Sequence, residues 1–196
     1  MFRVTPLVRN LIIINVVVYL IQMLVPVSTY FLALFDLGSP YFKPYQFFTY
    51  MFAHSPDSFF HILFNMLALA SFAPVLESYW GEKKLLFFYL STGIGAGVIY
   101  GVINYFLQTT GGVMMGASGA IYGILMAFGM VFPNLEIMLL FPPIPLKAKY
   151  MVFVMGFITY LMDRSGTVAH LAHFGGAFVA FIIISVWRGQ GSNRGW

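Results

Sequence analysis

The sequence predicts an all-α membrane protein in which a single domain, residues 1–196, forms a bundle of six transmembrane helices. Composition is the first reason: hydrophobic residues make up 60% of the chain, charged residues make up 8%, and the mean hydropathy is +0.86. Soluble proteins contain roughly half apolar and a quarter charged residues. The second reason is that the apolar residues gather into six separate segments. Lipid is therefore the expected solvent around the bundle.

The charged residues exclude several classes of function. Ten basic and six acidic residues give a net charge of +4. The basic residues fall singly or in pairs between apolar segments and form no stripe, so we expect no nucleic-acid partner. Cysteine is absent, which excludes disulfides and a cysteine nucleophile. The sequence also lacks a His-Glu-x-x-His pattern, and we expect neither a metal nor a cofactor.

The apolar segments have the length of membrane spans, since about 20 helical residues cross about 30 Å of hydrocarbon. Their approximate limits are residues 7–25, 59–79, 85–107, 118–132, 150–162 and 168–187. The first segment ends at Val25, and no small-x-small cleavage site follows it at Val25-Pro26, so we interpret it as a helix and not as a signal peptide. Gly81 separates the second segment from the third, and prolines within residues 142–145 precede the fifth.

Basic residues orient the predicted bundle. Six spans put both termini on one side of the membrane, and cytoplasmic loops carry the excess of lysine and arginine. With cytoplasmic termini, only Lys43 and Arg164 lie outside. The remaining basic residues lie inside: Arg3, Arg9, Lys83, Lys84, Lys147, Lys149, Arg188 and Arg194. We expect cytoplasmic termini, and the minimal six-span form suggests a bacterial inner membrane.

The first outer loop, residues 26–58, is long and rich in aromatic side chains. They are Tyr30, Phe31, Phe35, Tyr41, Phe42 and Tyr45. Aromatic residues favour the membrane interface, so we predict short helices inserted in the outer leaflet. The alternative is a flexible extracellular loop.

The fourth segment, residues 118–132, is too short to cross, because it forms only about 22 Å of helix. We expect it to begin below the outer surface. The glycines and threonines of residues 108–117 would then run into the membrane as irregular backbone, which is tolerated only where protein buries it or water reaches it. A water-filled pocket beside Ser118 follows, and the free amides at the helix start would suit an oxyanion.

Small residues flank Ser118 and His173. Gly116 relaxes the backbone before the helix, Gly119 with Gly123 forms one small-residue face, and Gly176 with Ala180 forms another. Close packing of these faces would bring the Ser118 hydroxyl and the His173 imidazole within about 3 Å, as a general base requires. Tyr122, one turn after Ser118, could stack on the imidazole. The alternative for Tyr122 is simple packing.

His61 and Asn65 lie four residues apart in the second segment, so their side chains point the same way. Both can donate hydrogen bonds, and neither is cheap to bury in lipid without a partner. We interpret them as donors to a tetrahedral oxyanion. The alternative is that they are polar contacts between helices.

With these motifs, nearly all of the chain resembles the rhomboid intramembrane serine proteases. The resemblance rests on His61-x-x-x-Asn65 in the second segment, Gly116-x-Ser118-Gly119 opening the fourth and Ala172-His173-x-x-Gly176 in the sixth. It implies that Ser118 is the nucleophile and His173 the base. It further implies that His61, Asn65 and the Ser118 amide bind the oxyanion and that Tyr122 stacks on His173. The implied partners are the lipid bilayer and transmembrane substrates, which pass the second and fifth spans and carry a helix-weakening segment with a small residue before the cut.

The chain departs from the family at two points. Ala180 stands where a second glycine is usual, and the outer loop lacks the tryptophan-arginine pair of many relatives, so its anchoring needs another explanation. His170 competes with His173 as the base, but only His173 has alanine before it and glycine three residues after it.

We predict a Ser-His dyad, because Asp163, Glu77 and Glu82 all lie away from the expected site. Two alternatives to a protease are considered. One is a catalytically silent rhomboid-like protein that binds membrane clients, and the other is a transporter or channel. The sequence specifies no oligomeric state.

Overall fold

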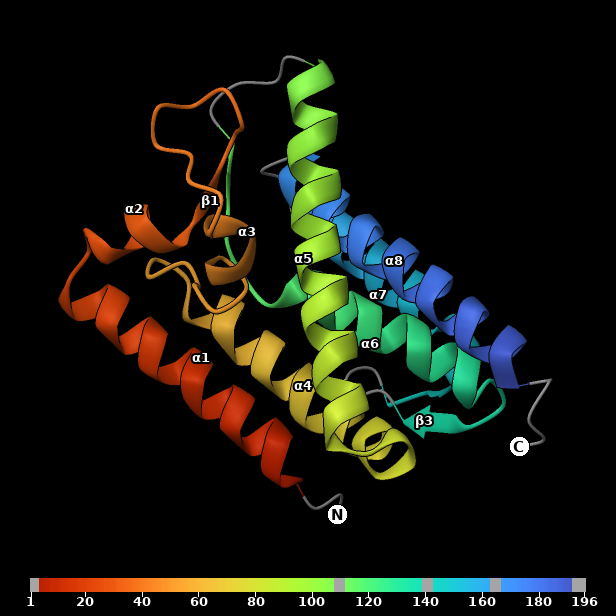
Figure 1. Cartoon of the computed structure of the whole chain (residues 1–196). Coiled ribbons are helices and arrows are strands. Elements are labelled where there is room, and N and C mark those ends of the chain that lie inside the picture. Colours follow the sequence, from red (N-terminus) through yellow and green to blue (C-terminus); the bar gives the residue numbers. More distant parts are fainter. Residues whose placement is uncertain (1–3, 108–111, 139–142, 163–166, 192–196) are drawn as a thin grey trace.

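The computed structural model describes residues 4–107, 112–138, 143–162 and 167–191, and they form a helical bundle (Figure 1). The bundle contains six principal helices: α1 (Pro6–Leu24), α4 (Phe59–Trp80), α5 (Glu82–Leu107), α6 (Ser118–Val131), α7 (Met151–Met162) and α8 (Thr167–Gly191). Each corresponds to one predicted apolar segment. The predicted all-α membrane bundle is confirmed.

Helix lengths divide the bundle into two classes. In the described residues, α1, α4, α5 and the stretch His170–Gly189 of α8 are long and apolar enough to cross a membrane. Helix α6 is short, with 14 residues, as the sequence predicts. Helix α7 is also short, with 12 residues, and it matches the predicted segment 150–162 except for Tyr150, which ends the 3-10 helix η1 (Ala148–Tyr150).

Helix α6 is the core of the bundle. It packs against α8, α5, α4 and α7, and ten of its 14 residues are buried. Helix α1 lies on the outside against α4 and exposes a lipid-facing row that includes Ile13, Val17 and Leu24. A helix surrounded by other helices can keep polar groups away from lipid, so α6 is the element best suited to carry chemistry.

Small residues set how closely α5, α6 and α8 approach. A Cβ atom built on Gly176 would lie 1.8 Å from the Gly119 carbonyl oxygen, so no side chain fits there. A Cβ on Gly119 would lie 2.7 Å from the Ala96 Cβ of α5. A Cβ on Gly123 would lie 2.7 Å from the Thr92 Cβ of α5. Gly123 therefore faces α5, whereas the small-residue pattern suggested that it faces α8. The glycines of α6 therefore allow two helices, α5 and α8, to approach its backbone closely.

The outer loop contains the two short helices α2 (Ser28–Leu32) and α3 (Gln46–Thr49). Tyr30, Phe31 and Tyr41 are exposed, which suits the interface, whereas Phe35 is buried, contrary to its predicted interfacial role. Insertion of the loop in the outer leaflet stays a prediction.

Buried side chains anchor this loop without a tryptophan-arginine pair. Tyr50 and Met51 are fully buried against α5, where the Tyr50 hydroxyl donates to the Gly93 carbonyl oxygen at 2.6 Å. On α1, the Gln22 carboxamide oxygen accepts from the His54 amide at 2.9 Å. The loop is thus tied to two different helices.

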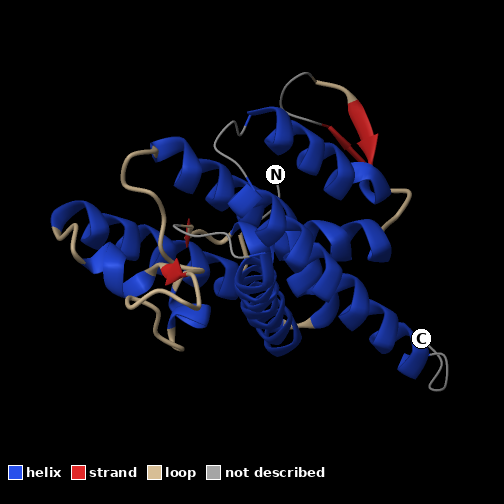
Figure 2. Ribbon diagram, turned by 90° about the horizontal axis from the view of Figure 1, so that it is seen from above, coloured by secondary structure: helices blue, strands red, loops and turns tan. Residues whose placement is uncertain are grey.

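Two small strand pairs are absent from our sequence prediction, and Figure 2 shows them as minor additions to the helices. Strand β1 (Leu34–Phe35) pairs antiparallel with β2 (Val113–Met114), and β3 (Glu136–Met138) with β4 (Pro145–Lys147). Strands of two or three residues carry no period-2 pattern for the sequence to reveal. The β1–β2 pair fixes the backbone that leads into α6. Of the irregular segment predicted there, residues 108–111 lie outside the described residues.

The two ends of the bundle differ in charge. Of the seven described lysines and arginines, only Lys43 lies at the end that carries the outer loop. The other six are at the end where α1 begins and α8 ends: Arg9, Lys83, Lys84, Lys147, Lys149 and Arg188. The remaining residues of the predicted charge count, Arg3, Arg164 and Arg194, lie outside the described residues.

Substitution of Gly176 tests the closest helix contact. We expect Gly176→Ala to destabilise the protein by at least about 2 kcal/mol, because the new methyl group must push α8 away from the α6 backbone. The midpoint of thermal unfolding in detergent micelles measures this. Gly189→Ala in the same helix is the control, since a Cβ there meets nothing within 4 Å. Equal unfolding midpoints for the two variants would contradict the contact.

Candidate active site

Ser118 is the first residue of α6 and is half-buried. The Ile121 amide donates to the Ala117 carbonyl at 3.0 Å and begins the helical hydrogen bonding. The amides of residues 118–120 therefore have no carbonyl one turn earlier within the helix. A serine hydroxyl and free helix-start amides thus lie at the same place, where the helix dipole favours negative charge.

His173 lies on the face of α8 that meets α6. Its imidazole stacks on the Tyr122 ring, with 4.0 Å between centroids and 9° between planes. Tyr122 is one turn after Ser118, and the preceding residue on α8, Ala172, has its carbonyl oxygen 3.6 Å from a Cβ built on Gly119. The structure therefore brings His173 against the first turns of α6, the same part of the helix that carries Ser118.

The Tyr122 ring is itself held from α7. Its hydroxyl lies 2.8 Å from the Thr159 hydroxyl, and the Thr159 hydroxyl donates to the Met155 and Gly156 carbonyls, both at 3.0 Å. Because a hydroxyl has one proton, Thr159 accepts from Tyr122. Two helices, α6 and α7, thus fix the plane against which the His173 imidazole of α8 stacks.

His61 is placed by the outer loop. The Ser55 amide donates to His61 Nδ1 at 3.3 Å, so Nδ1 is the unprotonated nitrogen and the neutral ring carries its proton on Nε2. A Cβ built on Gly116 would lie 2.8 Å from that Nε2. The donor nitrogen of His61 therefore faces the backbone two residues before Ser118.

Gly116 has two reasons to be glycine. Its φ is +123°, a conformation that residues with a side chain rarely adopt, and the His61 imidazole occupies the space of a Cβ. Its amide donates to the Tyr50 carbonyl at 2.9 Å. Gly116 thus joins the start of α6 to the outer loop.

Asn65 is buried, one turn after His61. Its carboxamide donates to the His61 carbonyl at 2.7 Å and so turns back on its own helix. The NH₂ group has a second N–H, which is the donor available for chemistry. Among the described residues, this hydrogen bond joins Asn65 to His61 and not to Ser118.

His54 is a residue that the sequence reasoning missed. It is fully buried, and its ring meets the His61 ring edge to face with 5.1 Å between centroids. Burial in the first place, and the neighbouring His61 in the second, lower the pKa of His54 from 6.5 to about 3. The neutral imidazole of His54 therefore packs against the ring of His61. The sequence did offer one signal for His54: a chain this apolar has only four histidines, and an ionisable residue in a membrane protein is costly to bury and often functional.

Other candidate residues lie elsewhere. The His170 ring contacts Tyr160 of α7, at 5.2 Å between centroids, and Glu77 accepts from the Thr5 hydroxyl and the Val8 amide near the start of α1. Asp163 lies outside the described residues. No group of three His, Cys, Asp or Glu suited to a metal occurs in the described part of the chain. The water-filled pocket beside Ser118 stays a prediction.

Comparison with known proteins identifies relatives. A family model described as "Rhomboid domain" matches residues 41–189. "Rhomboid protein 1, mitochondrial" of Saccharomyces cerevisiae is 29% identical over 146 residues, which are 74% of this chain and 34% of that protein. "Putative rhomboid protease YdcA" of Bacillus subtilis is 38% identical over 66 residues, 34% of this chain and 31% of that protein. The chain thus spans about a third of the length of these relatives.

The buried neutral His54 predicts an acid-sensitive fold. The pKa of His54 is about 3 in the folded state and about 6.5 in the unfolded state. Below about pH 6.5 the unfolded state therefore binds a proton that the folded state does not bind, so the stability of the fold falls as the pH falls. We expect about 2 kcal/mol less stability at pH 5 than at pH 7 from this residue. His54→Gln should remove that part of the pH dependence of the thermal unfolding midpoint.

The matched control is His170→Gln, a histidine on α8 whose ring contacts Tyr160. It should keep the wild-type dependence on pH. If His54→Gln also kept it, His54 would not be the buried neutral group that weakens the fold in acid.

Proposed function

The chain belongs to the rhomboid family, and we propose that it is an intramembrane serine endopeptidase with Ser118 as nucleophile and His173 as general base. The family supports intramembrane proteolysis of membrane proteins. One observation carries the assignment of the dyad: the Tyr122 ring, one turn after Ser118, stacks on the His173 imidazole at 4.0 Å. An imidazole in that position is oriented by the same helix that presents the hydroxyl.

The proposed reaction has two halves. In the first, His173 accepts the Ser118 hydroxyl proton as the oxygen attacks the substrate carbonyl, and then gives that proton to the leaving amine. In the second, water attacks the acyl-enzyme, His173 accepts a water proton, and the proton returns to Ser118 as the acid is released. No carboxylate is required, and the Tyr122 stack takes over the orienting role that an aspartate has in a triad.

The oxyanion would be stabilised by three donors. The Ser118 amide is one of the free amides at the start of α6, and His61 offers Nε2–H because the Ser55 amide donates to its Nδ1. The second N–H of the Asn65 carboxamide is the third. Donors of this kind gain strength where little water competes with them.

The length of α6 supports cleavage near one surface of the membrane. Fourteen residues give about 21 Å of helix against about 30 Å of hydrocarbon. With Val131 at the basic end of the bundle, Ser118 lies about 9 Å below the opposite interface. A substrate helix must unwind locally there, because its peptide groups are occupied by their own hydrogen bonds. We therefore propose transmembrane or juxtamembrane segments as substrates.

We also propose that residues 1–196 act as one domain with both termini in the cytoplasm. Six of the seven described basic residues lie at the end of the bundle where α1 begins, and cytoplasmic ends carry such an excess. The active site then opens toward the outer side. A bacterial inner membrane remains our proposal for its location.

Active-site labelling tests the dyad directly. A serine-directed fluorophosphonate should label the wild-type protein in detergent, and Ser118→Ala and His173→Ala should each abolish labelling and cleavage of a transmembrane reporter. The matched controls are Ser71→Ala, whose hydroxyl bonds within α4, and His170→Ala, whose ring contacts Tyr160. Both should keep labelling and cleavage. Cleavage that survives Ser118→Ala would exclude the protease mechanism, and a wild-type protein that binds but never cleaves membrane clients would favour the catalytically silent alternative.

The oxyanion donors have a kinetic signature. Each of His61→Ala and Asn65→Ala should lower kcat by about 10²- to 10³-fold with little change in KM, because the donors bind the developing charge and not the ground state. Ser78→Ala is the control on α4, since its hydroxyl bonds to the Pro74 carbonyl. A rise in KM at unchanged kcat would assign His61 and Asn65 to substrate binding instead.

A further inference from the structure

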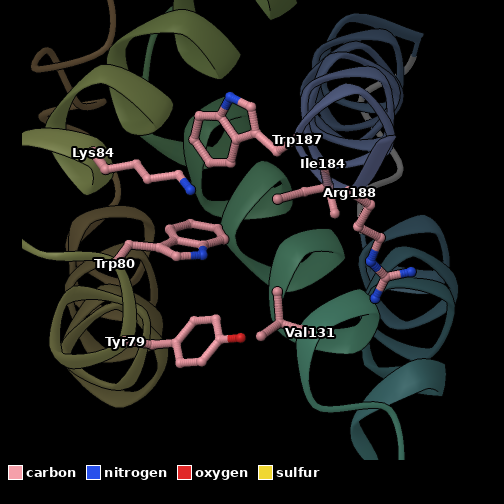
Figure 3. Close-up of a pocket in the computed structure, with 7 residues that line it drawn as sticks. All are labelled: Tyr79, Trp80, Lys84, Val131, Ile184, Trp187 and Arg188. Atoms are coloured by element: carbon pink, nitrogen blue, oxygen red, sulfur yellow. The ribbon is translucent and has the colours of Figure 1, made fainter. Parts of the chain in front are cut away.

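A hollow of about 290 Å³ is shown in Figure 3. It lies at the basic end of the bundle beside Val131, the last residue of α6, whereas Ser118 is the first residue of that helix. Its walls come from the last turn of α4, the first turn of α5 and the ends of α6 and α8. Trp80 and Trp187 form its aromatic side, with their rings edge to face at 5.3 Å. The hollow takes no part in the proposed hydrolysis, so it needs its own explanation.

Two cations line the hollow. The Lys84 ammonium lies 4.2 Å from the Trp187 ring centroid and 5.9 Å from that of Trp80, and Figure 3 shows it pointing between the two rings. The exposed Arg188 guanidinium donates to the Met130 carbonyl at the end of α6. A guanidinium has five N–H donors, so this bond leaves others for a ligand. Both cations therefore border a partly apolar space that suits an anion.

The surroundings place this hollow at a membrane interface. Tyr79, Trp80 and Trp187 together line the hollow. Tryptophan and tyrosine favour the headgroup level of a membrane. Phe87 of α5, whose ring centroid lies 6.4 Å from that of Trp187, and Val186 of α8 are exposed apolar side chains next to this aromatic group. A headgroup bound in the hollow could therefore keep its acyl chains against apolar side chains.

We propose that the hollow between Trp80, Lys84, Trp187 and Arg188 binds the phosphate headgroup of an anionic phospholipid. The volume suits a headgroup and not a whole lipid. Basic pockets between transmembrane helices recognise such headgroups, because the cations neutralise the phosphate while the aromatic rings sit at the interface. The site is independent of the proposed proteolysis, and its test requires no cleavage.

Native mass spectrometry of the delipidated full chain tests the proposal. We titrate it in detergent with dioleoylphosphatidylglycerol or dioleoylphosphatidylcholine and expect retention of the anionic lipid at lower concentration. Lys84→Gln or Arg188→Gln should weaken that binding about fivefold, and the double variant about thirtyfold. Lys83→Gln is the matched control: it removes the same charge from the neighbouring residue, which is exposed and lies outside the hollow. It should bind as the wild type does.

Each other outcome overturns the proposal. Equal weakening by Lys83→Gln and Lys84→Gln would mean general attraction to a basic surface, and equal binding of both lipids would remove the role of the anion. Glycerol 3-phosphate is added as a competitor, and displacement of the lipid at equal concentration would identify a site for a soluble phosphate. Thermal unfolding without lipid shows that the variants fold. Trp187→Leu, which keeps both cations, should also weaken binding, because the Trp187 ring lies 4.2 Å from the Lys84 ammonium and forms part of the proposed site; unchanged binding would contradict that site.

Discussion

The contact between Gly119 of α6 and Gly176 of α8 is the constraint on which the rest of the site depends. Helices gain no hydrophobic energy by leaving lipid for one another, so their association relies on close packing of small residues. With 1.8 Å between the Gly119 oxygen and a Cβ position on Gly176, the two backbones touch. Only at that separation does the His173 ring reach the Tyr122 ring at 4.0 Å. The glycines thus set how closely His173, one turn before Gly176, approaches the first turns of α6, where the proposed nucleophile Ser118 directly precedes Gly119.

The second constraint is the predicted start of α6 below the membrane surface, which requires the backbone before α6 to be paired. A helix that begins inside the membrane leaves amides without partners, which is costly in hydrocarbon. Here the segment before Ser118 is paired: β2 bonds to β1, and the Gly116 amide donates to the Tyr50 carbonyl. Tyr50 in turn is anchored on Gly93 of α5. The outer loop therefore pairs the backbone that precedes Ser118, and the amides of residues 118–120 stay available for the proposed oxyanion.

Much of this could be predicted from the sequence because membrane spans and their motifs are local signals. Runs of apolar residues gave the six helices, and the shortness of residues 118–132 indicated a start below the surface. Contacts between residues far apart in the chain could not be predicted from the sequence. The sequence does not indicate that Gly123 would face Thr92 of α5, or that Phe35 would be buried. His54 also escaped notice, since its role depends on a fold that brings a loop residue against a ring seven residues later. The proposed catalytic roles rest on the motifs together with this geometry.

The outer loop is part of the proposed site and not only a cover for it. A neutral imidazole can carry its proton on either nitrogen, and the wrong tautomer would present a lone pair to the oxyanion. The bond from the Ser55 amide to His61 Nδ1 selects the ring form with the proton on Nε2. His54 packs against the same ring, and Gln22 of α1 holds the His54 backbone. Displacement of this loop would free the His61 imidazole to turn and would remove a proposed oxyanion donor, even with Ser118 and His173 in place.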